Sequence, residues 1–190
     1  AHGHTALAAT RYCVFSHGKE SGPWGKKIIA LAETARSEGY SVESIDYRGI
    51  DSVDGRVARL VEGCKDLQGE LVLVGSSLGG FVATAASSFL HARGVFLMAP
   101  ALYLDGLPPL RPKVVDCPVE IVHGWHDEVV PLEHSMRFAR EYGAALHVLE
   151  RRLEARVHVQ LLLDLQLLLR LQFGLRGDDV REQTGRLDVA

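Results

Sequence analysis

The residue of this chain best suited to act as a nucleophile is a serine in a tight turn. Residues 71–87 read LVLVGSSLGGFVATAAS, an apolar run followed by a small-residue turn and an Ala-rich apolar run. Gly75, Ser77 and Gly79 match the G-x-S-x-G pattern between a predicted strand and a predicted helix. Larger side chains at the two glycine positions would collide with neighbouring elements. The pattern predicts that Ser77 is exposed in strained backbone geometry, unless the segment is only a turn without chemistry.

Two further segments carry residues that such a serine would need. The sequence FSHGKESGPWG (15–25) places His17 and Gly18 at the end of a predicted strand, before a loop that enters a helix. The sequence VHGWHDEVVP (122–131) places Asp127 just after another predicted strand. A catalytic triad needs a carboxylate that orients the histidine and stabilises its imidazolium form. Asp127 is a candidate for this carboxylate.

Two other carboxylates compete with Asp127 for this role. Glu128 is adjacent to it, and Asp105 follows the preceding predicted strand. The group His123, His126 and Asp127 could also indicate a metal site. Three ligands so close together on one strand and loop do not converge easily, however, so we expect no metal.

Alternating strands and helices must position these residues. Runs typical of strands lie at 12–15, 41–46, 71–75, 94–99, 119–124 and 146–149. Helix-length stretches between them lie at 24–39, 51–67, 77–92 and 132–143. This alternation predicts an α/β fold with a mainly parallel sheet of about six strands and helices on both faces. In such sheets, ligands bind beyond the carboxyl ends of the strands.

The three motifs together resemble the α/β-hydrolase family in its small lidless form, over roughly residues 11–150. The resemblance implies an α/β-hydrolase core without a cap domain. It also implies that Asp127 is the acid of a catalytic triad with Ser77, and that the backbone N–H groups of Leu78 and Lys19 form the oxyanion hole. His17 is implied to brace the loop by hydrogen bonds rather than to act in catalysis.

In this family the histidine follows the acid and lies after the last strand, which leaves His158 as the base by elimination. His147 falls inside the last predicted strand, where packing or surface exposure is expected. His158 runs directly into a Leu-rich stretch, and residues 160–172 show no clear polar helix face. Three explanations stay open. This helix could be buried in a homo-oligomer interface, it could contact an apolar substrate or a membrane surface, or the reading frame could change near residue 150.

Composition limits the function classes. The 190 residues are expected to form a single domain, 1–190, with a disordered tail at 174–190. A net charge of −3 with dispersed basic residues gives no reason to expect nucleic acid as a partner. Three cysteines without metal-type spacing, and a start without a secretory signal, predict a cytoplasmic protein with reduced thiols. Asp164 and Arg170 argue against stable membrane insertion.

The predicted function is a serine hydrolase without a cofactor. It would cleave a small carboxylic ester or thioester through an acyl-enzyme intermediate. From loop positions alone, the pocket walls are predicted at Trp24, Tyr103, Leu104 and Leu107. The alternative is a hydrolase-like binding or interaction protein with little or no turnover.

Overall fold

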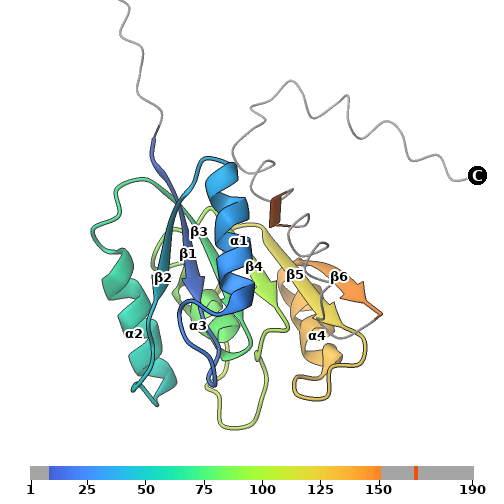
Figure 1. Ribbon diagram of the computed structural model, residues 1–190. Helices are drawn as coiled ribbons and strands as arrows, with labels where there is room; N and C mark the ends of the chain where they lie inside the picture. The colour runs from blue at the N-terminus through green and yellow to red at the C-terminus, as the bar shows by residue number, and fades with distance from the viewer. Residues whose placement is uncertain (1–8, 151–164, 167–190) are drawn as a thin grey trace, which may run out of the picture.

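A computed structural model describes residues 9–150 and 165–166 of the chain. One six-stranded parallel sheet organises it (Figure 1), in the strand order β2-β1-β3-β4-β5-β6. The strands are β1 (Arg11–Ser16), β2 (Ser41–Ile45), β3 (Glu70–Ser76), β4 (Gly94–Met98), β5 (Val119–Gly124) and β6 (Ala145–Leu149). The helices are α1 (Lys26–Ser37), α2 (Val53–Cys64), α3 (Leu78–Ser87) and α4 (Leu132–Tyr142). The predicted fold class is confirmed.

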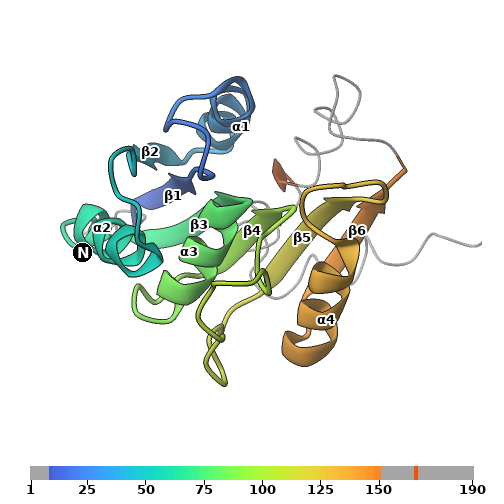
Figure 2. The same ribbon diagram turned by 90° about the horizontal axis from the view of Figure 1, so that it is seen from below.

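Helices cover both faces of the sheet. Figure 2 shows α1 on one side of the strands, with α3 and α4 on the other. Two separate core clusters match this arrangement. One contains buried residues of α2, α3 and α4, and the other contains buried residues of α1. The apolar faces of these four helices therefore pack on the two faces of the sheet and bury it between two helical layers.

The central strands are apolar on both sides because both sides are covered. In β3, Leu71 and Leu73 pack into the cluster of α2, α3 and α4, whereas Val72 and Val74 pack into the cluster of α1. All five residues of β4 are buried. The continuous apolar runs seen in the sequence are thus strands of a buried parallel sheet.

The loops that follow the strands gather at one edge of the sheet, where a functional site is expected. The carboxyl ends of β1, β3 and β5 meet there, since all strands run in the same direction. Within the described part, the longest link between strands without a helix is 99–118, between β4 and β5. None of the helices in the described ranges has the length and apolar character needed to cross a bilayer.

Candidate active site

Ser77 lies in the turn between β3 and α3, with φ 53° and ψ −122°. A non-glycine residue at this φ is strained and persists only where its surroundings hold it. Two backbone hydrogen bonds do so. The Ser77 N–H donates to the carbonyl of Met98 at 3.1 Å, and the Ser77 carbonyl accepts from the N–H of Ala101 at 2.9 Å. The end of β4 and the residues after it thus fix the turn that presents Ser77.

The two flanking glycines are required by contact distances. A Cβ at Gly75 would lie 2.6 Å from the carbonyl oxygen of Gly79, at the start of α3. A Cβ at Gly79 would lie 2.0 Å from the carbonyl oxygen of Ser16 and 2.4 Å from that of His17, at the end of β1. These distances are far below van der Waals contact, so any residue with a Cβ at either position would clash. The two glycines of the G-x-S-x-G pattern are therefore needed because α3 lies so close to the ends of β1 and β3.

Ser77 lines a cavity with a volume of about 790 Å³. The loop after β1, the start of α1 and the loop after β4 form most of its wall. Leu104 and Leu107, two of the predicted wall residues, line it. Trp24 and Tyr103 lie outside the lining. Trp24 is exposed to solvent, and Tyr103 is turned toward α4, where its hydroxyl donates to Glu141 at 3.2 Å.

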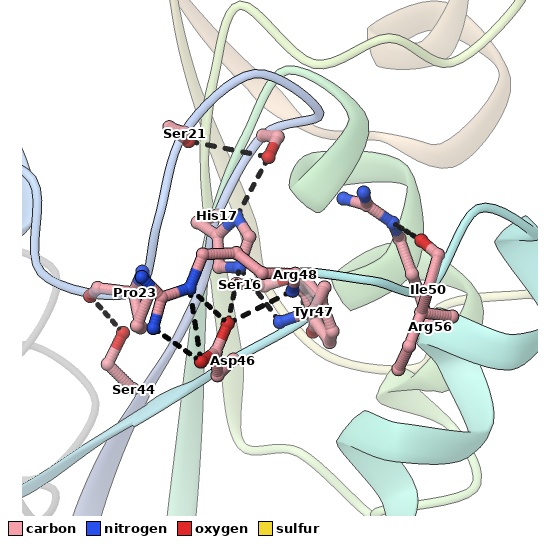
Figure 3. A network of polar contacts seen from close by, with 11 residues as sticks. Ser16, His17, Ser21, Pro23, Ser44, Asp46, Tyr47, Arg48, Ile50 and Arg56 are labelled. Atoms are coloured by element: carbon pink, nitrogen blue, oxygen red, sulfur yellow. Dashed lines mark hydrogen bonds and ion pairs between the residues drawn. The ribbon is translucent and has the colours of Figure 1, made fainter.

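The loop after β1 is fixed by the buried side chain of His17 (Figure 3). Its Nδ1 lies 2.8 Å from the carbonyl oxygen of Gly18, and its Nε2 accepts from the N–H of Tyr47 at 2.9 Å. Because a carbonyl can only accept, Nδ1 carries the proton and the ring is neutral. Burial is the main cause that lowers the pKa of His17, and the nearby Arg56 lowers it further. With both nitrogens engaged, His17 braces the loop and has no nitrogen left to serve as a base for Ser77.

One peptide group of this loop has a fixed orientation. The carbonyl of Gly18 accepts from His17 and also from the hydroxyl of Ser21 at 3.3 Å. A trans peptide points its carbonyl oxygen and the following N–H in opposite directions, so the N–H of Lys19 points away from the His17 ring. Lys19 borders the cavity, and a Cβ placed on Gly18 would lie 3.5 Å from the Cβ of Ser77.

A second set of contacts that holds the loop after β1 was not predicted from the sequence. The Ser16 hydroxyl bonds both to the Tyr47 hydroxyl and to the carbonyl of Gly79, each at 2.8 Å. Ser44 donates to the carbonyl of Pro23, and the Arg56 guanidinium lies 5.6 Å from the centre of the Tyr47 ring. The contacts of Tyr47 with Ser16 and of Ser44 with Pro23 join β2 and the segment after it to β1 and the loop that follows it (Figure 3). The only signal in the sequence was a set of polar and aromatic residues directly after a predicted strand.

Asp127 lies in the loop between β5 and α4. Its Oδ1 accepts from the N–H groups of Val129 and Val130, both at 2.8 Å, and its side chain is 19% exposed. Its charge also reaches α1, because it raises the pKa of Lys27 against the stronger effect of burial. The backbone bonds fix one carboxylate oxygen and leave the other, Oδ2, for a further partner.

The buried side chain of His123 holds the same loop by hydrogen bonds to Val130 and to Ser135 of α4. Its Nδ1 lies 2.7 Å from the hydroxyl of Ser135, and its Nε2 lies 2.8 Å from the carbonyl oxygen of Val130. Nε2 therefore carries the proton, and it lies 3.6 Å from Asp127 Oδ2. Both nitrogens of His123 are used inside the protein, while His126 is exposed. Among the described residues, no group of three or more potential ligands could hold a metal ion.

The remaining candidates occupy different places. Glu128 and Asp105 are exposed, and Asp105 lines the cavity rim. His147, in β6, lies on the surface with its Nε2 2.6 Å from Glu120 Oε2 on β5. His158 lies outside the described residues, as do positions 174–190.

Leu165 and Gln166 are the described residues of the C-terminal stretch. Leu165 is fully buried in the core cluster that contains Ile28 and Leu31 of α1. The Gln166 amide donates to Glu38 at 2.6 Å. These two residues pack against the α1 side of their own chain.

Comparison with known proteins places this geometry in a family. The model of the alpha/beta hydrolase family matches residues 13–184. The chain belongs to the α/β-hydrolase family. A hydrolase of the α/β superfamily from Xanthomonas campestris pv. campestris has a similar structure, with 33% identity, a TM-score of 0.76, and coverage of 84% of this chain and 97% of that one. XC6422 from Xanthomonas campestris, an α/β serine hydrolase without a lid, aligns with a TM-score of 0.62 and 18% identity over 90% of this chain and 84% of its own.

A curated relative is more distant in sequence. The mouse protein named palmitoyl-protein thioesterase ABHD10, mitochondrial, is 27% identical over 183 residues. The alignment covers 66% of this chain and 62% of the mouse protein, which is less than two thirds of the relative's length. The resemblance stated from the motifs is confirmed.

Proposed function

We propose that this α/β-hydrolase cleaves carboxylic esters or thioesters with Ser77 as its nucleophile. The observation that carries the proposal is the strained conformation of Ser77, held at the carboxyl edge of the sheet on the wall of a cavity of about 790 Å³. Strain of this kind is characteristic of functional residues. The kinship with serine hydrolases and with a thioesterase supports the same chemistry.

The reaction would proceed in two stages. The Ser77 Oγ attacks the acyl carbon while a histidine removes its proton and passes it to the leaving alcohol or thiol. Water then attacks the acyl-enzyme with the same histidine as base, and the acid is released. The N–H groups of Leu78 and Lys19 would hold the oxyanion, each contributing about 3 kcal/mol to transition-state stabilisation. Leu78 is suited to this because the first N–H of a helix has no partner within the helix.

The acid and the base have separate support. Asp127 has one oxygen fixed by backbone N–H groups, a setting suited to orienting an imidazole. His158 is proposed as that imidazole from its position in the chain, after the acid and after β6. Changing His158 to Gln should lower the rate about 10²–10⁴-fold. The matched control is His147→Gln, because His147 lies on the surface of β6 paired with Glu120.

Hydrolysis of p-nitrophenyl butyrate tests the function. We expect turnover by the wild type and a loss of about 10³-fold or more in kcat/KM for Ser77→Ala. Ser76→Ala is the matched control, since Ser76 is the preceding residue and lines the same cavity; it should stay active. A wild type without turnover, or equal rates for the wild type and Ser77→Ala, would overturn the proposal in favour of a binding protein.

A further inference from the structure

The charged residues around the Ser77 cavity are not equivalent. The charged residues that line it are Lys19, Glu20, Lys26, Lys27, Asp51 and Asp105. All but one are exposed and belong to the rim, where water and salt screen their charges. Lys27, the second residue of α1, is the exception because it is partly buried. Lys27 therefore places a positive charge in the cavity wall, where it is less exposed to water than the charges at the rim.

Lys27 has no close ion-pair partner among the residues that the structure describes. It forms no hydrogen bond or ion pair of 4.0 Å or less with any of them, although Asp127 is close enough to act on it. Asp127 Oδ1 accepts from two backbone N–H groups and Oδ2 lies 3.6 Å from His123 Nε2, so the carboxylate acts on Lys27 through its charge and not through a direct contact. Burial lowers the pKa of Lys27 more than the charge of Asp127 raises it.

The cavity that Lys27 lines is formed partly by the apolar side chains of Ile28, Leu78, Leu104 and Leu107. Its carboxylates, Glu20, Asp51 and Asp105, are exposed at the rim, and none forms an ion pair of 4.0 Å or less with Lys27. A cation among apolar groups is costly unless an anion reaches it. An anionic group on the bound molecule would meet this need, and the ammonium would bind it by a charge-assisted hydrogen bond.

We propose that Lys27 is a specificity residue that selects ester or thioester substrates carrying a carboxylate or similar anionic group. The inference rests on the proposed function of Ser77, since both residues line the same cavity. The anionic group could belong to the acyl part or to the leaving group, and the chemistry at Lys27 is the same in both cases. Lys27 takes no part in bond cleavage.

Two pairs of matched substrates test the proposal. In the first, p-nitrophenyl hexanoate is compared with p-nitrophenyl hydrogen adipate, so that the charge lies on a six-carbon acyl chain. In the second, 4-(butanoyloxy)benzamide is compared with 4-(butanoyloxy)benzoate, so that the charge lies on the leaving group. Each pair gives a ratio of kcat/KM for the charged over the neutral ester. The pair whose ratio depends on Lys27 identifies the charged part.

The variants are Lys27→Met, which keeps length and removes charge, and Lys27→Arg, which keeps the charge. We expect Lys27→Met to lower the ratio about tenfold or more in at least one pair, and Lys27→Arg to retain most of it. Lys26→Met is the matched control, because Lys26 is adjacent and exposed at the rim; its ratio should change less than about threefold.

Two results would overturn the inference. In the first, Lys27→Met leaves the kcat/KM values of all four esters, and therefore both ratios, as in the wild type. In the second, Lys27→Met slows the neutral and charged esters equally, which would assign Lys27 a structural pairing with Asp127. In both cases Ser77-dependent turnover of the neutral esters would persist, so the proposed function would survive. If no ester is turned over, the proposed function fails and this inference fails with it.

Discussion

At the scale of single residues, the acid of this site has two separable functions. Asp127 holds the loop after β5 through its bonds to the N–H groups of Val129 and Val130. It also supplies the negative charge that a catalytic imidazolium would need. An amide oxygen can accept the same two backbone bonds but carries no charge. The two roles can therefore be separated by substitution.

Asp127→Asn should leave the free energy of unfolding within about 1 kcal/mol of the wild type and lower kcat about 10³–10⁴-fold. Asp127→Ala should show the same loss of kcat and a further destabilisation of about 1–2 kcal/mol, because the two N–H groups lose their acceptor. Urea unfolding and p-nitrophenyl butyrate hydrolysis measure the two effects. Glu128→Gln is the adjacent control. A large loss of kcat in Glu128→Gln, with Asp127→Asn still active, would transfer the role of acid to Glu128.

At the scale of elements, the site depends on the loop after β1 being tied to the residues after β2. His17 makes this tie, donating to Gly18 and accepting from the N–H of Tyr47. Both bonds require the neutral ring with the proton on Nδ1. The folded state therefore resists protonation of His17, and its pKa lies below the ordinary value of 6.5.

This lowered pKa predicts a pH dependence with a definite sign. Below pH 6.5 the unfolded chain binds a proton at His17 while the folded protein does not, so acid favours unfolding. The contribution of His17 should be fully present above pH 6.5 and be lost as the pH falls toward the lower folded pKa. Urea unfolding should thus show a stability difference between wild type and His17→Asn that shrinks from pH 7 to pH 5.

The exposed His126 provides the control for this experiment. His126→Asn should have a stability close to that of the wild type at both pH values. At pH 7, His17→Asn should cost about 1–3 kcal/mol, because the buried N–H of Tyr47 loses its acceptor. A difference for His17→Asn that stays constant or grows in acid would contradict the assigned tautomer.

The elements were predictable from the sequence, whereas several contacts at the site were not. Strand and helix positions follow from local apolar patterns, and the six predicted strands agree with the structure to within one residue at each end. The turn at Ser77 was predictable because its glycines are local to it. The tie from Tyr47 to His17, the turn of Tyr103 toward α4 and the depth of Lys27 depend on how distant segments pack, which no local pattern encodes.

At the scale of the whole molecule, the C-terminal stretch is attached to the α1 side through Leu165 and Gln166. Leu165 is fully buried, so Leu165→Ala should lower the free energy of unfolding by about 2–5 kcal/mol. Ile29→Ala is the control on α1, because Ile29 is 46% exposed and should cost less than about 1 kcal/mol. Urea unfolding measures both. Equal, small effects would show that Leu165 is not part of the core.

The central claim is that Ser77 is the nucleophile, and covalent labelling tests it most directly. The wild type is treated with a fluorophosphonate probe and digested with trypsin, which releases residues 66–93 as one peptide. Fragmentation of this peptide separates Ser77 from Ser76, Ser87 and Ser88. We predict a single adduct on Ser77 and no labelling of Ser77→Ala. An adduct on another serine, or no adduct on the folded wild type, would contradict the claim.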